Sequence, residues 1–459
     1  MDDYSYTFDA ISDCLGMVQL VDQHAGGDLT FQAALNDQRL SYWPSTEVRP
    51  QMADLADLAL AVHIADRFSG HVPGRSARIQ ITLPVREPAL FNDPATLQAL
   101  CDVLYWYTED SWSFSFTQRT KARRATERQS SFDTALMATP RTEVALWSGG
   151  LDSFAGLWQR QIQHPETHYV LFGTGANLAI LHRQQELLRL FRDVSSTQPS
   201  LVQVPLRLRT PRGTSRNRYQ RTRGFVFLLL GSVCAQLEGL SVLHLYENGV
   251  GALNLPFRAA EVGTDHSRSV HPLSLLRMGN LVSCLLGASF TFVNPFLFST
   301  KTEMCASLRG TAAEGLIAHT TSCDSRLRHP DQPTECGRCS SCLLRRQAIA
   351  ASGLTDQTAY ATQTFADSDD RFVLDLMLGQ RNTFHTMFEA ASPWDALRRR
   401  YPILQTTATR MAQASDLPHE QLAAQILSLY TRYAEEWDQV QHLLDPTCSH
   451  GPLWGSGAA

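Results

Sequence analysis

The stretch Val144-Ala-Leu-Trp-Ser-Gly-Gly-Leu-Asp-Ser153 decides the fold of this chain. Its apolar start, residues 144–147, is typical of a short buried strand, and Gly149 and Gly150 let the backbone turn tightly. Apolar residues then recur at helical spacing, which predicts a helix directly after the turn. The N–H groups of its first turn and the positive end of its dipole attract an anion. The stretch therefore predicts a phosphate-binding loop.

Polar side chains in the same stretch add to this anion site. The hydroxyls of Ser148 and Ser153 can donate hydrogen bonds to phosphate, and Asp152 can hold a magnesium ion against it. An ordinary capped helix is the commoner explanation of a Gly-Gly pair alone, but Ser-Gly-Gly-Leu-Asp-Ser is more specific. The hexapeptide resembles the PP-loop of the ATP pyrophosphatase superfamily. That resemblance implies ATP binding by Ser148, Gly149, Gly150, Leu151, Asp152 and Ser153, followed by substrate adenylation and pyrophosphate release.

The composition is that of a globular protein with several domains. The chain has 459 residues, of which 43% are hydrophobic and 19% charged, and its formal net charge is −5. This length predicts two or three domains, and the acidic balance argues against a nucleic-acid partner. No apolar run is long enough to span a membrane, and the acidic start differs from a signal peptide. We therefore expect a soluble, cytoplasmic protein without a membrane partner.

Residues 1–118 predict an N-terminal α+β accessory domain. Apolar residues recur at helical spacing over 55–62 and 97–105, and they alternate as in strands over 79–85 and 112–116. His63 and Asp66 lie near the end of the first helix, where we expect surface or capping residues. Residues 119–140 are polar and basic, which predicts a solvated linker between this domain and the phosphate-binding loop.

Residues 141–351 predict an α/β domain with a doubly wound parallel sheet. The strand before the loop, the helix after it and a second apolar strand at 169–172 form a βαβ unit. Further strands are predicted at 201–206, 242–246 and 290–293, with a helix at 225–237. Ligands bind at the carboxyl ends of parallel strands. Phe172 and Gly173, which end the second strand, are therefore predicted to contact the adenine of ATP.

Polar residues that follow a later strand are candidates for substrate binding. The strand at 242–246 runs into Glu247, Asn248 and Gly249. The two polar side chains can pair with a heterocycle, and the glycine permits a close approach. An ordinary Asn-Gly turn is the alternative. Asp265, in the next polar loop, is a weaker substrate candidate.

Basic residues supply the cations that an anion site needs. Thr300 and Lys301 lie at a predicted helix start, where the lysine can neutralise phosphate; a plain helix cap is the alternative. Residues 207–223 contain seven arginines. Arg221 or Arg223, at the start of the following helix, can bind a phosphate or a substrate carboxylate. A solvated cover and a tRNA-contacting patch are the alternatives for this loop.

Four of the ten cysteines lie in one segment with metal-ligand spacing: Cys323, Cys336, Cys339 and Cys342. Two-residue spacings let one knuckle supply three thiolates while a loop returns the fourth, which favours tetrahedral Zn²⁺. An iron–sulfur cluster is the alternative, although nothing else in the sequence indicates redox chemistry. Four cysteine ligands leave no open coordination position. The metal is therefore predicted to be structural.

The order and content of these motifs resemble the 7-cyano-7-deazaguanine synthase (QueC) family over about residues 141–351. The PP-loop, the arginine at a helix start, the Thr-Lys pair and the segment Cys336–Arg345 carry the resemblance. This family uses ATP to adenylate 7-carboxy-7-deazaguanine, and ammonia converts the acyl adenylate to the nitrile. The resemblance implies that Lys301 supports the phosphates and that the cysteines hold zinc. The predicted catalytic residues are then Asp152, Lys301 and Arg223, and the predicted cofactors are ATP, Mg²⁺ and Zn²⁺.

The chain also resembles the enlarged QueC-like proteins of anti-phage islands such as the Qat system. It has 143 residues before Val144 and more than a hundred after Cys342. This resemblance implies that the acyl group passes to an amine of a partner protein instead of to ammonia. Residues 352–459 predict a helical extension, in which the helix at 422–444 needs a partner helix within the chain. A tRNA-modifying PP-loop enzyme and a nucleotide-binding scaffold without turnover are the other hypotheses.

Overall fold

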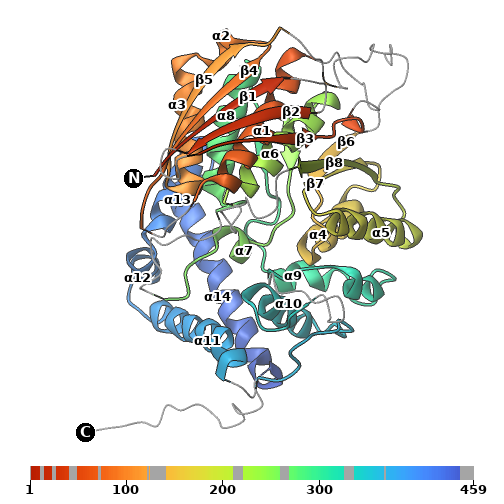
Figure 1. The fold of residues 1–459 in the computed structure, drawn as a ribbon. Helices are drawn as coiled ribbons and strands as arrows, with labels where there is room; N and C mark the ends of the chain where they lie inside the picture. The colour runs from red at the N-terminus through yellow and green to blue at the C-terminus, as the bar shows by residue number, and fades with distance from the viewer. Residues whose placement is uncertain are drawn as a thin grey trace.

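Figure 1 shows the fold in a computed structural model, which describes residues 2–10, 15–22, 27–40, 49–70, 74–120, 124, 141–209, 221–258, 268–324, 335–365 and 368–444. Within these residues the strands form a ten-stranded sheet in the order β10-β9-β6-β7-β8-β3-β2-β1-β4-β5. They are β1 (Asp3–Ala10), β2 (Leu15–Asp22), β3 (Gly27–Leu35), β4 (Arg78–Val85), β5 (Ser111–Gln118), β6 (Thr142–Leu146), β7 (His168–Gly175), β8 (Ser200–Arg209), β9 (Val242–His244) and β10 (Thr291–Val293). The predicted α/β class is confirmed.

The sheet consists of a parallel block, β6 to β10, joined to a block of mixed strand direction, β1 to β5. Strands β6 to β10 are parallel, as the sequence predicts. Strand β3 joins them antiparallel to β8, with Gln32 opposite Arg209 and Leu35 opposite Leu206. Strands β1, β4 and β5 therefore run opposite to β6. Their carboxyl ends lie on the side of the sheet where β6 to β10 have their amino ends. Both predicted domains thus contribute to one sheet, and the boundary between them stays a prediction.

Helices cover both faces of the parallel block, as a doubly wound sheet requires (Figure 1). One face of the sheet carries α6 (Arg223–Leu237) and α8 (Pro272–Leu286) over the parallel block, and α1 (Pro50–Phe68) and α3 (Pro94–Thr108) over β3 to β5. The other face carries α4 (Leu151–Gln163) and α5 (Leu178–Val194). Side chains alternate between these faces along β6, where Val144 belongs to the first core and Ala145 to the second. Because both faces are buried, consecutive residues in the middle of β6 and β7 are apolar, as at Val144–Ala145 and Tyr169–Phe172.

The C-terminal part is helical, as predicted. Its helices are α9 (Lys301–Ala306), the 3-10 helix η4 (Glu314–His319), α10 (Ser340–Ala351), α11 (Ser368–Phe388), α12 (Pro393–Arg400), α13 (Pro402–Ala414) and α14 (His419–Leu444). Two short helices lie earlier in the chain, α2 (Pro88–Phe91) and α7 (Gly249–Leu253). The predicted partner for the last helix is confirmed, since α14 packs on α10, α11 and α13. Its Tyr430 ring lies 4.9 Å from the Phe384 ring of α11. None of the described helices is long and apolar enough to cross a membrane.

Two residues predicted at the surface of the N-terminal part are buried. His63 and Asp66 on α1 are 5% and 2% exposed. Arg221, 155 residues further along the chain, donates to Asp66 at 3.0 Å and to Asp110 at 2.7 Å. The surface prediction is therefore wrong, because a distant arginine neutralises the buried carboxylates. The guanidinium of Arg221 fastens α6 to α1.

Two arginines of the predicted linker also point into the protein. The Arg119 and Arg124 side chains are 6% and 3% exposed, and both pair with Asp57 of α1. Nearby Arg86 donates to the same carboxylate at 2.7 Å. The prediction of solvated charges is wrong at these positions, because a buried carboxylate needs positive partners. Residues 121–123 and 125–140 of the predicted linker lie outside the described residues.

Candidate functional site

The predicted phosphate-binding loop follows β6 and opens α4. Gly149 has a φ of +75°, a left-handed conformation that favours glycine, and Gly150 is the N-cap residue of α4. The Ser148 hydroxyl accepts the N–H of Gly150 at 3.1 Å, and the Ser153 hydroxyl donates to the Gly150 carbonyl at 3.0 Å. Glycine brings no side chain to cap the helix, so its first turn is suited to an external anion.

The loop is fastened on two sides. Thr321 N–H donates to the Gly149 carbonyl at 3.0 Å, and the Gln184 amide of α5 donates to the Ser148 carbonyl at 3.3 Å. A Cβ at Gly150 would lie 3.2 Å from the Thr321 carbonyl oxygen. These contacts fix the backbone of the loop from segments that lie far away in the sequence.

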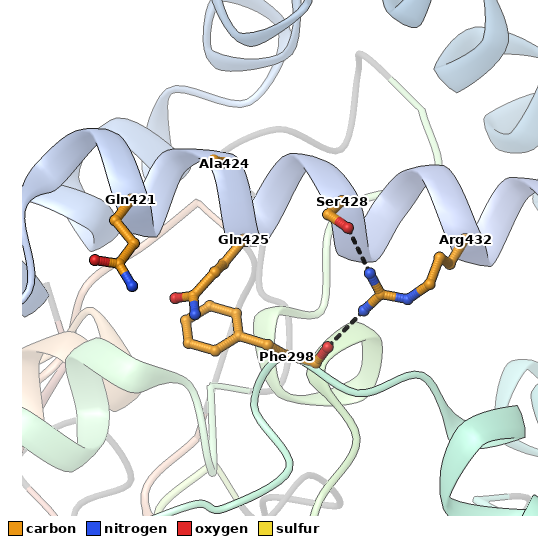
Figure 2. A pocket seen from close by; sticks show the side chains of 6 residues that line it. All are labelled: Phe298, Gln421, Ala424, Gln425, Ser428 and Arg432. Carbon is orange, nitrogen blue, oxygen red and sulfur yellow. Dashed lines mark hydrogen bonds between the residues drawn. The ribbon is translucent and has the colours of Figure 1, made fainter.

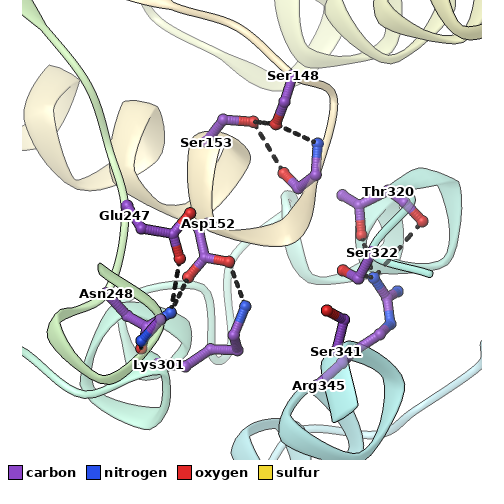
Figure 3. Close-up of polar contacts among 12 residues, drawn as sticks. Ser148, Asp152, Ser153, Glu247, Asn248, Lys301, Thr320, Ser322, Ser341 and Arg345 are labelled. Atoms are coloured by element: carbon purple, nitrogen blue, oxygen red, sulfur yellow. Dashed lines mark hydrogen bonds and ion pairs between the residues drawn. The ribbon is translucent and has the colours of Figure 1, made fainter. Parts of the chain in front are cut away.

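Charged and amide side chains meet beside the first turn of α4 (Figure 3). The Lys301 ammonium forms an ion pair with Asp152, and the two side chains are 6% and 13% exposed. Asn248 donates to Asp152 Oδ1 at 3.0 Å and to Glu247 Oε1 at 2.9 Å. The structure therefore brings together four residues that the sequence predicts as catalytic or substrate-binding.

The charges of this cluster are balanced. Burial and the nearby Asp152 carboxylate raise the pKa of Glu247 to about 8, although Lys301 opposes the shift. Burial disfavours the charged form of Lys301, but Asp152 and Glu247 outweigh it and raise the lysine pKa. Glu247 therefore keeps its proton to a higher pH than an ordinary carboxyl group, and it lies next to Lys301, which favours the charged form. A neutral carboxyl group can donate a hydrogen bond to a ligand.

Local capping motifs position these side chains. Asn248 is the N-cap residue of α7, where its Oδ1 accepts the Gly251 N–H at 2.9 Å. Thr300 caps α9 in a capping box with Glu303, and Lys301 is the first residue of that helix. The helix start predicted at Thr300 is confirmed. Asn294 fixes the neighbouring turn, because its amide donates to the Glu247 carbonyl at 2.8 Å.

Gly249 is required by its neighbours. A Cβ there would lie 2.0 Å from the Leu297 carbonyl oxygen and 2.6 Å from Leu429 Cδ2 of α14. The Gly249 N–H donates to the Ser299 carbonyl at 2.8 Å. The close approach that the sequence predicts at this glycine is thus made by the protein's own backbone.

We expect Gly249→Ala to destabilise the protein by about 2 kcal/mol or more, because backbone must move to admit the methyl group. Thermal and urea unfolding monitored by circular dichroism measure this change. Gly379→Ala is the matched control, since a Cβ on this helical residue meets nothing within 4 Å. The control should gain up to roughly 1 kcal/mol from helix propensity. Equal stability of the two variants would contradict the close packing at Gly249.

The four predicted cysteine ligands gather in one cluster. All four Sγ atoms lie within 4.8 Å of one another, and the pairs Cys336–Cys342 and Cys323–Cys339 are each 3.9 Å apart. Sulfur atoms about 2.3 Å from a tetrahedral Zn²⁺ lie roughly 3.8 Å from each other. The cluster therefore fits zinc, and its four thiols have the softness this ion prefers.

The backbone of the knuckle supports the same assignment. Gly337 has a φ of +82°, and a Cβ there would lie 2.4 Å from the Thr362 carbonyl oxygen. The N–H groups of Cys336 and Cys339 point at the sulfurs of Cys323 and Cys336, at 3.4 and 3.3 Å. Such N–H groups stabilise thiolates.

A buried arginine on the helix that carries Cys342 contacts the segment next to the phosphate-binding loop. Arg345 of α10 is fully buried and donates to the Thr320 hydroxyl at 2.6 Å (Figure 3) and to the Ile317 carbonyl at 2.6 Å. Thr321 is the residue whose N–H binds Gly149. The arginine that ends the predicted Cys-rich motif therefore fixes the segment beneath the loop.

The remaining predicted site residues are Phe172, Gly173, Arg223 and Asp265. Phe172 and Gly173 lie within β7, which continues to Gly175. Phe172 is fully buried, and a Cβ on Gly173 would lie 2.4 Å from the Gln184 side chain. Arg223 begins α6 at the surface, with its guanidinium 5.3 Å from the Phe227 ring. Asp265 lies outside the described residues.

Comparison with known proteins gives a distant relationship. No protein-family model matches the chain. The 7-cyano-7-deazaguanine synthase of Pseudomonas syringae pv. tomato is 26% identical over 240 residues, which are 48% of this chain and 98% of the synthase. The synthase of Pseudomonas savastanoi pv. phaseolicola is 25% identical over 244 residues, 49% of this chain and 98% of its own. The chain is distantly homologous to these synthases.

About half of the chain lies outside this similarity, whereas the synthases are matched over almost their whole length. The homology agrees with the family resemblance of the loop and cysteine motifs. The additional half belongs to this chain and not to those synthases.

Proposed function

We propose that this protein is an ATP-dependent ligase that adenylates the carboxylate of 7-carboxy-7-deazaguanine. The carboxylate oxygen attacks the α phosphorus of ATP, the bond to the β-phosphate oxygen breaks, and pyrophosphate leaves. A nitrogen nucleophile then attacks the acyl carbon, a C–N bond forms, and AMP leaves. The observation that carries this proposal is the Lys301–Asp152 ion pair at the opening of α4, next to the Gly149–Gly150 turn. The distant homology to deazaguanine synthases supports the substrate class.

The loop residues would bind the leaving pyrophosphate. The first turn of α4 directs N–H groups and a positive dipole at the phosphates, and the Ser148 and Ser153 hydroxyls lie 3.2 Å from each other beside it. Lys301 adds a positive charge that offsets the charge developing on the departing phosphates. This arrangement favours attack at the α phosphorus, since the β and γ phosphates are the ones bound.

Asp152 would hold Mg²⁺, which supplies charge neutralisation and orients the phosphates when bound. The Lys301 ammonium lies against this carboxylate, and this ion pair supports the proposal that Asp152 attracts a cation. Asn248 keeps the other carboxylate oxygen in place at 3.0 Å. Cys323, Cys336, Cys339 and Cys342 would hold a structural Zn²⁺ in their 4.8 Å cluster.

We further propose that the nitrogen nucleophile is an amine of a partner protein, as in anti-phage systems. About half of the chain lies outside the similarity to the 7-cyano-7-deazaguanine synthases and could dock such a partner. The chain also has only two lysines, Lys121 and Lys301, among its 40 basic residues. Few amines of its own therefore compete for a reactive acyl adenylate. Ammonia is the alternative nucleophile, because the relatives are named as nitrile-forming synthases.

Pyrophosphate release measured with and without 7-carboxy-7-deazaguanine tests the first proposal. We expect release only when ATP and the deazaguanine are both present. Release that instead requires tRNA would favour a tRNA-modifying enzyme, and no release under any condition would leave a nucleotide-binding scaffold. Both results would overturn the proposed adenylation.

Mass spectrometry tests the acceptor. The protein, ATP and deazaguanine are incubated with the product of the neighbouring gene, and we expect the mass of that partner to increase by one acyl group. Free amide or nitrile without a mass increase would show that ammonia is the acceptor and that the protein is a nitrile synthase.

A further inference from the structure

We propose that Glu436 of the C-terminal helix α14 is a positioning residue for Lys301. This inference rests on the proposed function, because it assigns Lys301 to the ATP site. Glu436 lies 136 residues from Thr300 in the sequence, yet its carboxylate contacts the start of α9, the helix that Lys301 opens. It acts through the backbone of α9 and does not itself contact the predicted phosphates.

Glu436 is 8% exposed, and three side chains donate hydrogen bonds to its carboxylate. Thr300 Oγ1 donates to Oε1, and Thr302 Oγ1 donates to Oε2 at 2.7 Å. Gln347 Nε2 of α10 donates to Oε2 at 3.2 Å. A buried carboxylate is stable only when such donors satisfy it, so the three donors and the acceptor fix one another.

The Thr300 hydroxyl makes this contact directional. It accepts the Glu303 N–H at 3.1 Å as the N-cap of α9, and its own hydrogen is donated to Glu436. The residue before and the residue after Lys301 are therefore both bound to one carboxylate. This clamps the backbone from which the Lys301 side chain reaches Asp152.

Other residues of α14 strengthen the same contact. Arg432, one turn before Glu436, donates to the Phe298 carbonyl at 2.7 Å (Figure 2). Arg432 also pairs with Glu303 at 2.8 Å. A cavity of about 280 Å³ opens beside it, lined by Phe298, Gln421, Ala424, Gln425, Ser428 and Arg432. Leu429 of the same helix closes over Gly249. The helix thus supports both segments that deliver Lys301 and Asn248.

Chemical labelling of Lys301 tests the proposal without ATP or deazaguanine. Lys301 and Lys121 are the only lysines of the chain, so an amine-acetylating reagent followed by peptide mass spectrometry reports Lys301 against one internal reference. In the unchanged protein Lys301 is 6% exposed and paired, so its labelling is slow. Glu436→Gln should speed its labelling about tenfold, because a charge-assisted set of hydrogen bonds is lost.

Asp438→Asn is the matched control. It makes the same carboxylate-to-amide change two residues away, but Asp438 pairs with Arg381 and His385 of α11. We expect Lys301 labelling in this control within about twofold of the unchanged protein. If Glu436→Gln is too unstable to purify, Thr302→Val replaces it, with Thr302→Ser as the variant that keeps the hydroxyl. Faster labelling in Thr302→Val but not in Thr302→Ser supports the proposal.

Pyrophosphate release tests whether Glu436 acts through Lys301. Glu436→Gln should lower pyrophosphate release about tenfold, but in a Lys301→Met background it should change release less than about twofold, because it acts through Lys301. Equal Lys301 labelling in Glu436→Gln and Asp438→Asn, or a full further loss in the Lys301→Met background, overturns the positioning role. An unchanged protein that releases no pyrophosphate contradicts the proposed function alone, since the labelling still decides the role of Glu436.

Discussion

An Asp152→Asn variant is expected to release pyrophosphate roughly a thousandfold more slowly than the unchanged protein. The two side chains have the same shape, and Asn can keep a hydrogen bond with Asn248. The substitution removes the negative charge that pairs with Lys301 and that would hold Mg²⁺. It also leaves a buried ammonium without its closest partner, so Lys301 can no longer be presented in one orientation. Pyrophosphate is measured at saturating ATP and deazaguanine.

Asp193→Asn provides the control for this variant. Unlike the largely buried Asp152, Asp193 is exposed: its side chain, near the end of α5, is 62% exposed and pairs with Arg189 at 3.3 Å. Exposed pairs contribute little, so this control should keep its turnover within about twofold. Circular dichroism and zinc content should match in all three proteins. Turnover of Asp152→Asn within tenfold of the unchanged protein would remove Asp152 from the reaction.

The parts of the site that the sequence predicts are those encoded by neighbouring residues. The Gly149–Gly150 turn, the cap at Thr300 and the spacing of Cys336 and Cys339 depend on contacts within a few positions of the chain. Local sequence is enough to specify such turns and caps. The parallel direction of β6 and β7 followed from the βαβ pattern for the same reason.

The residues that fasten the site were not predictable, because their contacts cross the chain. Gln184 reaches the loop from α5, Arg345 reaches Thr320 from α10, and Glu436 reaches Thr300 from α14. Each is a polar residue in a helical pattern, where the ordinary expectation is solvent. The surface position predicted for Asp66 is wrong for the same reason, since its partner Arg221 is 155 residues away.

The antiparallel join of β3 to β8 also escaped prediction, and it affects how the N-terminal part relates to the site. Because β4 and β5 run opposite to β6, their carboxyl ends lie at the edge away from the Gly149–Gly150 loop. The amino ends of these strands share the edge of the loop. A partner that docks on the N-terminal part and reaches the loop would therefore meet the start of β4 and not its end.

The cysteine cluster should influence the ATP site through a short chain of contacts. Cys342 lies in the first turn of α10, and Arg345 follows it on the same helix. Arg345 binds Thr320, and the adjacent Thr321 binds the Gly149 carbonyl at 3.0 Å. A metal that fixes α10 thus also fixes the segment on which the loop rests. Losing the metal should loosen the loop even though the cysteines do not contact ATP.

Cys339→Ser is therefore expected to lose about one bound zinc per chain, to lower the melting temperature by roughly 5 °C or more, and to slow pyrophosphate release. Metal analysis, thermal unfolding and the pyrophosphate assay measure these three effects. Cys284→Ser, at a cysteine of α8 outside the cluster, should change none of them. If metal analysis finds iron and the protein has a visible charge-transfer band, the four cysteines hold an iron–sulfur cluster and the zinc assignment is wrong. Loss of zinc with full turnover would instead break the proposed link from Arg345 to the loop, because the loop would then keep its geometry without the metal.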